Sequence, residues 1–226
     1  MVSDVKVAKV FDSLFFNTLP KDAVLSLGKC SQMDFFSRDK WYLAGGTALA
    51  LQSGHRKSYD LDFFTENKSF DEKGVEKVLN EYGKWVTNNI SKGTVFGIFS
   101  KTKMSLIAYP FFTPAEKISK FGTVSLLAIG DIAIMKIVAI SQRGKKRDFF
   151  DLYWICNNVV SLQESILKVD KQYSVRQNPT HILKSLVYFQ DAEDDPEPEI
   201  YFKATWKEVK KFFSREISII AKKIIR

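Results

Sequence analysis

Two aspartates separated by one residue, Asp60 and Asp62, are the side chains of this chain whose type and spacing best suit chemistry. They lie in the run from Tyr59 to Phe64, which predicts a strand. Side chains alternate along a strand, so both carboxylates share one face, about 6.5 to 7 Å apart at the backbone. Such a pair converges on hard cations such as Mg²⁺. The pattern indicates a metal site, although a solvated acid pair at a strand edge has the same spacing.

A glycine turn precedes the acid pair. The apolar run Trp41–Ala44 predicts a short buried strand, which Gly45 and Gly46 interrupt. Thr47 is expected to cap the helix that follows, with Gly54 as its C-cap. Glycines allow backbone to approach a ligand closely, and the first N–H groups of a helix attract anions. A phosphate cradle beside an acid pair indicates a nucleoside triphosphate (NTP) site, although a Gly-Gly turn before a helix is common.

The order of these motifs resembles a known signature. Gly46-Thr47, then twelve residues, then Asp60-Leu61-Asp62 is similar to the pattern of the DNA polymerase β-like nucleotidyltransferase superfamily. The longer strings, LAGGTAL at 43–49 and RKSYDLDF at 56–63, resemble the AbiEii/AbiGii-type toxins of abortive-infection toxin–antitoxin systems.

A lysine inside an apolar run forms the second informative stretch. Lys136 has four apolar residues on either side within 132–140, and we expect a helix there with Asp131 as its N-cap. A buried ammonium must snorkel or be paired. We expect its ammonium to lie near Asp60, Asp62 or Asp148, and we expect Lys136→Met to keep or raise stability, because it replaces a buried charge with an apolar chain of similar length.

Two further aspartates follow the lysine helix. Asp148 and Asp151 are three residues apart and therefore share a helix face. Acids at a helix N-terminus also simply favour the helix dipole. Residues 131–136 together with RDFFDLY at 147–153 again resemble the AbiEii-type family. The resemblance implies that Lys136 and Asp148 belong to the active site.

The family resemblance implies a set of roles. Asp60 and Asp62 would hold Mg²⁺, in one-metal or two-metal form, and Lys136 would neutralise the triphosphate. Asp148 would be a metal ligand or a general base. The implied catalytic residues are Asp60, Asp62, Lys136 and Asp148, and the implied nucleotide-binding residues are Gly45, Gly46, Thr47, Arg56, Ser58 and Lys136.

The implied reaction is transfer of a nucleoside monophosphate from an NTP to a hydroxyl, with the tRNA 3′ end as the implied acceptor and a cognate antitoxin as the implied partner. Two rivals stay open: nucleotidylation of a protein, and a catalytically silent NTP-binding module. The silent-module alternative is kept because a third carboxylate is missing. The strand expected at 103–108 has no acid where related enzymes carry a third carboxylate, and Ser105 is its best-placed polar residue.

The elements around these motifs predict an α+β protein. We expect a nucleotidyltransferase lobe at 1–128 with a small mixed sheet, a helical lobe at 129–226, and an active site in the cleft between them. Short connections predict an antiparallel meander. The meander consists of the expected strands 85–90, 95–99 and 104–108, and a further, peripheral strand is expected at 124–128. The expected helices are 4–17, 23–36, 70–82 (with a Ser69/Glu72 capping box), 161–170, 179–190 and 206–225.

Composition sets the class of protein. The 226 residues are 45% hydrophobic and 27% charged, as in globular proteins, and the net charge of +8 suits an anionic partner such as nucleotide or RNA. The two cysteines, Cys30 and Cys156, do not form a metal or disulfide pattern. No secretory signal and no run of about eighteen apolar residues is present. We therefore expect a cytoplasmic protein with no membrane partner.

Overall fold

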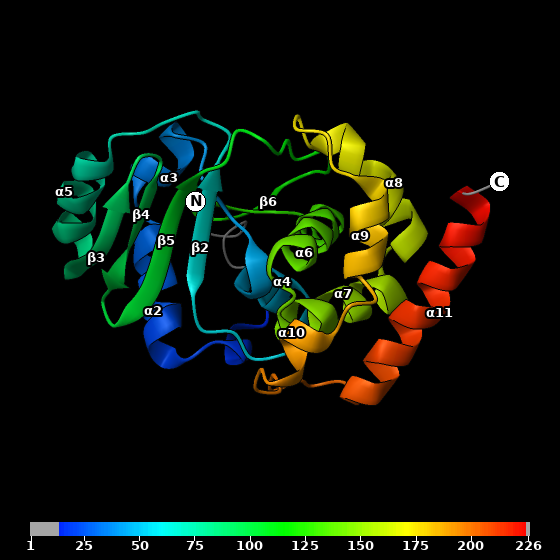
Figure 1. Cartoon of the computed structure of the whole chain (residues 1–226). Coiled ribbons are helices and arrows are strands. Elements are labelled where there is room, and N and C mark those ends of the chain that lie inside the picture. The colour runs from blue at the N-terminus through cyan, green and yellow to red at the C-terminus, as the bar shows by residue number, and fades with distance from the viewer. Residues whose placement is uncertain (1–13, 225–226) are drawn as a thin grey trace. The chain divides into compact units, whose positions relative to one another are not determined.

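The computed structural model describes residues 14–224, which form two compact units (Figure 1). The N-terminal unit contains the residues up to Thr113 together with Lys117–Ala128. The C-terminal unit contains Pro114–Glu116 and the residues from Ile129 onward. The chain therefore has an α+β fold, with its sheet in the first unit and a helical second unit.

The N-terminal unit is built on one mixed seven-stranded sheet with the order β3-β4-β5-β2-β1-β7-β6. Strand β2 pairs in parallel with β5, and β1 pairs in parallel with β7, whereas the remaining neighbours are antiparallel. The strands are β1 (Tyr42–Leu43), β2 (Leu61–Thr65), β3 (Trp85–Ser91), β4 (Thr94–Phe99), β5 (Thr102–Ala108), β6 (Ser119–Phe121) and β7 (Val124–Leu126).

Helices α2 (Lys21–Cys30), α3 (Asp34–Arg38) and α5 (Glu72–Tyr82) cover one face of this sheet. On α2, the Ser26 hydroxyl donates to the Phe99 carbonyl over 2.9 Å, and on α3 the Phe36 ring lies 4.4 Å from the Phe63 ring. The Thr87 hydroxyl of β3 bonds to the Glu76 carboxylate of α5. Apolar side chains at alternate strand positions face these helices, so the polar positions between them, Asp62 included, face the other way.

Helix α4 (Gly45–Ser53) connects β1 to the loop before β2. Its residues from Thr47 to Leu51 are all buried, and a helix that is apolar all round requires such an environment. The Gln52 side chain donates to the Leu127 carbonyl over 2.9 Å. The predicted C-cap is confirmed, because Gly54 ends the helix at φ +67°. Helix α4 is therefore fixed along its whole length, which holds its N-terminus in place.

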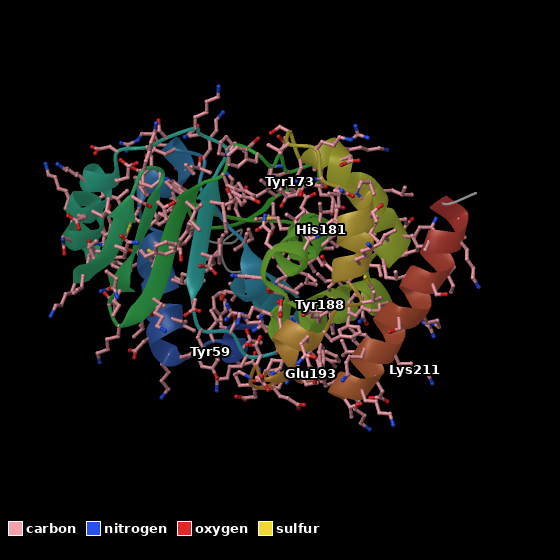
Figure 2. All side chains as sticks on the ribbon, in the orientation of Figure 1. Tyr59, Tyr173, His181, Tyr188, Glu193 and Lys211 are labelled. Atoms are coloured by element: carbon pink, nitrogen blue, oxygen red, sulfur yellow. The ribbon has the colours of Figure 1, made fainter. Side chains whose placement is uncertain are left out.

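The C-terminal unit is helical. Helix α6 (Ile129–Arg143) and helix α7 (Lys146–Asn158) form a hairpin whose turn is Gly144 at φ +52°. The remaining helices are α8 (Leu162–Gln172), α9 (Pro179–Ser185), α10 (Gln190–Glu193) and α11 (Trp206–Ile224). His181 on α9 is bonded to the Ser141 carbonyl of α6 through its Nε2 atom, 3.0 Å away (Figure 2).

The acidic loop after α10 is anchored to the start of α7. The Lys146 ammonium donates to the carbonyls of Glu193 and Asp195 over 3.0 and 2.6 Å and lies 5.6 Å from the centre of the Trp206 ring. Burial raises the pKa of the Asp195 carboxyl, but the bonds from the Lys146 N–H and the Lys145 ammonium outweigh that effect and hold the pKa below its ordinary value. This loop is therefore tied down by charge and is not simply solvated.

Several predicted helices have different boundaries. The predicted helix 23–36 is two helices, because the chain turns at Ser31, whose carbonyl accepts from the Thr123 N–H over 2.9 Å. The predicted helix 179–190 likewise divides into α9 and α10. Most of the predicted helix 4–17 lies outside the described residues, and the 3₁₀ turn η1 (Phe16–Thr18) stands at its end. The strand predicted at 124–128 is not peripheral, because β7 pairs with both β1 and β6.

Three predicted helix caps are wrong. Ala44, not Thr47, stands at the N-cap of α4. Asp71, not Ser69, caps α5 by accepting from the Gly74 N–H. Asp131 lies inside the first turn of α6 and accepts from the N–H groups of residues 115 and 116 and from the amide of residue 172. In each case a partner distant in sequence, or a better-placed neighbour, replaces the local cap.

Both cysteine thiols are free and neither is poised for reaction. Burial raises the pKa of the Cys30 thiol, and it raises the pKa of the Cys156 thiol to about 12. Along residues 14–224 we find no helix with the length and apolar character needed to cross a membrane.

Candidate active site

The glycine turn fits closely around two side chains. Gly45 has φ +65°, a conformation that favours glycine, and a Cβ atom there would lie 3.5 Å from Asp62 Oδ2. A Cβ atom on Gly46 would lie 2.1 Å from Nη2 of Arg56, a guanidinium that is only 5% exposed. Both positions therefore require glycine, the first for its backbone conformation and the second for space.

The threonine of the signature connects the helix to the acid loop. Its hydroxyl lies 2.9 Å from the Ser58 hydroxyl and donates to the Asp60 carbonyl. Thr47 is 3% exposed, so its side chain is committed to these bonds. Thr47 and Ser58 thus hold the segment that carries Asp60 against the start of α4, while Tyr59 between them is exposed (Figure 2).

The acid pair lies at the start of β2. Asp62 is inside the strand and half-buried, whereas Asp60 immediately precedes the strand. Ser105 on β5 stands directly beside Asp62 in the register, and its hydroxyl donates to Asp62 Oδ1 over 2.7 Å. Ser105 therefore lies on the neighbouring strand at the position where related enzymes carry a third carboxylate, as the sequence indicated.

The residues present suit a magnesium ion held by two carboxylates. Mg²⁺ binds through one or two carboxylates and completes its shell with water and phosphate. Ser105 donates to Oδ1 of Asp62, and the backbone of Gly45 passes close to Oδ2. Among residues 14–224 no group of three or more His, Cys, Asp or Glu side chains lies together as a metal cage. A metal ion bound here would have Asp60 and Asp62 as its carboxylate ligands.

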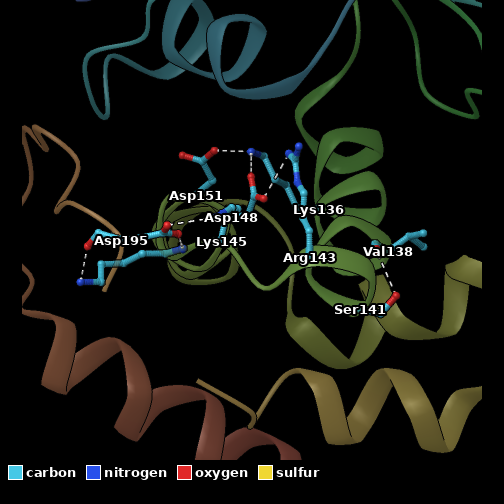
Figure 3. Close-up of polar contacts among 9 residues, drawn as sticks. Lys136, Val138, Ser141, Arg143, Lys145, Asp148, Asp151 and Asp195 are labelled. Atoms are coloured by element: carbon cyan, nitrogen blue, oxygen red, sulfur yellow. Dashed lines mark hydrogen bonds and ion pairs between the residues drawn. The ribbon is translucent and has the colours of Figure 1, made fainter. Parts of the chain in front are cut away.

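The predicted lysine and its acids form a buried ion-pair cluster on the hairpin of α6 and α7 (Figure 3). Nζ of Lys136 lies 2.6 Å from Asp148 Oδ1 and 2.5 Å from Asp151 Oδ2. Both carboxylates are fully buried and the lysine is 5% exposed. An ammonium has three protons to donate, and the two acids account for two of them.

A second cation completes the cluster. Nη2 of Arg143, at the end of α6, lies 3.3 Å from Asp148 Oδ2, and this arginine side chain is 53% exposed (Figure 3). The cluster therefore balances two positive against two negative charges. Asp151 and Arg143 were absent from the predicted site, although the i, i+3 spacing of Asp148 and Asp151 already placed the second acid on the same helix face.

The predicted residues thus fall into two groups. The N-terminal unit brings together Gly45, Gly46, Thr47, Arg56, Ser58, Asp60 and Asp62, and the C-terminal unit brings Lys136 and Asp148 together. Each group is assembled within its own unit.

Comparison with solved structures gives the class of the fold. A crystal structure from H. pylori, named as that of a candidate nucleotidyltransferase, aligns with a TM-score of 0.51 at 17% identity, covering 90% of this chain and 96% of that one. MenT4, the nucleotidyltransferase toxin Rv2826c of Mycobacterium tuberculosis H37Rv, aligns at 15% identity with a TM-score of 0.47, covering 85% and 82% of the two chains. The mixed sheet with its acid pair and glycine turn is accordingly a nucleotidyltransferase fold.

Sequence comparison gives the family. The family described as nucleotidyl transferase AbiEii toxin, type IV TA system, matches residues 31–113 and 98–219. An uncharacterized protein of Aquifex aeolicus (strain VF5), aq_aa25, is 37% identical over 202 residues, which covers 87% of this chain and 91% of that protein. The chain therefore belongs to the AbiEii family of nucleotidyltransferase toxins of type IV toxin–antitoxin systems.

Proposed function

We propose that this protein transfers a nucleoside monophosphate from an NTP to the hydroxyl at the 3′ end of tRNA. The acceptor oxygen loses its proton to water and forms a bond to the α-phosphorus, the bond from that phosphorus to the oxygen that bridges to the β-phosphate breaks, and pyrophosphate leaves with the electron pair. Family membership supports the NTP substrate and implies an antitoxin partner. The acceptor is our inference from the resemblance to toxins that act on tRNA ends.

The observation that carries the proposal is the geometry around Asp62. Its Oδ1 atom is held by Ser105 and its Oδ2 atom is close to the backbone of Gly45, so the carboxylate is oriented before any ligand binds. Preorganised charge of this kind is the largest source of rate enhancement in phosphoryl transfer. Bound Mg²⁺, held by Asp60 and Asp62, would supply charge neutralisation and activation of the acceptor oxygen.

The protein's own groups complete the proposed roles. The first N–H groups of α4, at Gly45, Gly46 and Thr47, receive the terminal phosphates, because a helix N-terminus attracts anions. Arg56 and Ser58 orient the turn and the acid segment.

We assign the lysine cluster to the same reaction. Lys136 donates its remaining proton to the triphosphate and neutralises charge there. Asp148 accepts a hydrogen bond from Lys136 and forms an ion pair with Arg143, which favours a role in holding Lys136 over that of a general base.

The experiment is transfer from α-labelled NTP in the presence of tRNA and of bacterial protein extract. Label on tRNA supports the proposal, label on protein identifies protein nucleotidylation, and no label under any metal condition identifies a silent module. Asp60→Ala and Asp62→Ala should abolish transfer with little loss of stability, since removing one carboxylate relieves like-charge repulsion. Glu66→Ala, an exposed acid just after β2, is the matched control and should keep activity.

Growth of a bacterial host tests the toxin function in the cell. Expression of the wild-type chain without its antitoxin should slow growth, and Asp62→Ala should relieve the effect. Harmless expression of the wild type in several hosts, at levels where the variant is equally abundant, argues against a toxin. Protection of the host from phage by the toxin–antitoxin pair would test the abortive-infection role.

A further inference from the structure

A row of paired residues runs from the acid pair across three neighbouring strands. Asp62 on β2 is the register partner of Ser105 on β5, and Ser105 is the register partner of Phe96 on β4. Directly paired residues point to the same side of a sheet. Phe96 therefore shares the face of Asp62, two strands away, which is about 10 Å at a strand spacing of 4.7 to 4.9 Å.

Phe96 is not part of the packed core. Its side chain is 39% exposed, and it makes no ring contact with another aromatic side chain within residues 14–224. The residues on either side of it, Val95 and Gly97, are buried on the opposite face of the strand. The Phe96 ring is exposed on the sheet face that carries Asp62 and lies in register with that residue. It is therefore suited to stacking on a nucleobase, since every base has a π-face.

Positive charge lies next to this ring. Lys103 on β5 is exposed and lies two residues before Ser105, so it projects from the same face. Its register partner on β4 is Ile98, whose own partner on β3 is Val86, 46% exposed. Lys103, Ile98 and Val86 form a second row beside the row of Asp62, Ser105 and Phe96. Two members of the second row are apolar, and the third is the lysine at one end.

The second row leads to a cavity with a basic rim. The cavity, of about 380 Å³, is lined by Val86 and Ile98 together with Lys84 and Lys101, and with Asp22 and Ser100. Apolar surface interleaved with lysines is the pattern of proteins that track a single strand, since bases stack on the apolar part and phosphates meet the cations.

We propose that this face, defined by Phe96, Lys103, Ile98 and Val86, binds the single-stranded 3′ end of the acceptor nucleic acid. Phe96 stacks on a base adjoining the reacting nucleotide, and Lys103 contacts a backbone phosphate. This inference rests on the proposed function, because it places the RNA acceptor beside the oriented carboxylate of Asp62. It goes further in assigning the acceptor to the β4–β5 side of the sheet.

Binding of a labelled single-stranded RNA oligomer with a tRNA-like 3′ end, measured by fluorescence anisotropy without NTP or metal, tests the stacking. Phe96→Ala should weaken binding about 5-fold to 150-fold, the range for loss of one base–aromatic stack. Phe96→Tyr should retain it. Tyr82→Ala is the matched control, since Tyr82 is 41% exposed on α5, which packs on the other face, and it should bind as the wild type does.

The salt dependence of the same assay tests the lysine. The slope of log K against log salt is negative, because salt weakens phosphate contacts. Lys103→Gln should make this slope shallower by about 0.7, the value for one phosphate contact on a single strand. Lys77→Gln, an exposed lysine of α5, should leave the slope unchanged. An unchanged slope for Lys103→Gln overturns its assignment.

Steady-state transfer separates this inference from the proposed function. With tRNA as acceptor, Phe96→Ala should raise KM for RNA and keep both kcat and KM for the NTP. If the wild type labels tRNA but Phe96→Ala has wild-type affinity and KM, the proposed function stands and the inference fails. If the wild type neither binds RNA nor labels it, the RNA acceptor fails and this inference fails with it.

Discussion

Replacing Lys136 by methionine tests the buried cluster most sharply. The variant leaves the fully buried carboxylates of Asp148 and Asp151 with one remaining cation, the half-exposed Arg143. Removing one partner of a buried ion pair costs about 3 to 5 kcal/mol. We expect the lower end, about 3 kcal/mol, because Arg143 still neutralises Asp148. For a chain of this size the thermal midpoint should fall by about 6 to 12 °C.

Urea and thermal unfolding of the wild type and the variant measure this loss. A triple variant, Lys136→Met with Asp148→Asn and Asp151→Asn, should recover most of it, because no unpaired charge stays buried. A single variant within about 1 kcal/mol of the wild type would refute the reasoning, as would a triple variant less stable than the single one.

In the proposed role, transfer should fall roughly 10²-fold to 10³-fold in Lys136→Met, even where the protein is fully folded. Lys136→Arg should also be impaired, since a forked guanidinium does not reproduce a compact ammonium.

Three further predictions follow from local geometry. Gly46→Ala must displace the Arg56 guanidinium and should cost about 1 to 3 kcal/mol and most of the activity, whereas Gly28→Ala, with open space around it in α2, should stabilise by about 0.5 to 1 kcal/mol in urea unfolding. The lowered pKa of Asp195 contributes stability above about pH 4 that is lost as the pH falls through the folded value, so Asp195→Asn should flatten the acid limb of a stability profile below about pH 5. The Cys156 thiol, with its pKa raised to about 12, should react with iodoacetamide at pH 8 at least about 100-fold more slowly than in urea, as peptide mapping of the alkylated site will show.

The elements next to the signature could be predicted because each local cue agreed with the others. The apolar run before Gly45, the buried helix after it and the glycine at position 54 all appear as the sequence indicated. The antiparallel meander β3–β4–β5 also follows from its short turns. Where several local cues indicate the same element, tertiary packing does not change that element.

Features that depend on distant partners could not be read in this way. The stability expected for Lys136→Met changes sign because the ammonium is shared by two fully buried acids, Asp148 and Asp151, which the variant would leave charged and buried. Strand β6 has one apolar residue, Phe121, and therefore no apolar pattern that would reveal it, and the parallel pairing of β7 with β1 joins Ser125 to the distant Tyr42. Helix caps failed for the same reason, since Asp131 bonds to segments 115–116 and 172 rather than to its own helix.

The signature itself contains more positioning groups than groups directed at a ligand. Gly46 makes room for the Arg56 guanidinium, and the Thr47 hydroxyl binds the Ser58 hydroxyl and the carbonyl of the first aspartate. In the proposed function only the carboxylates and the first N–H groups of α4 in this signature meet the ligand, and even Asp62 has one oxygen committed to a serine. A chain that keeps a Gly-Gly-Thr turn and an Asp-x-Asp pair without the arginine and serine between them would lack the contacts that hold the turn and the segment of Asp60 together. The ordered string is therefore a stronger sign of this site than any of its parts, because each part is held in place by another.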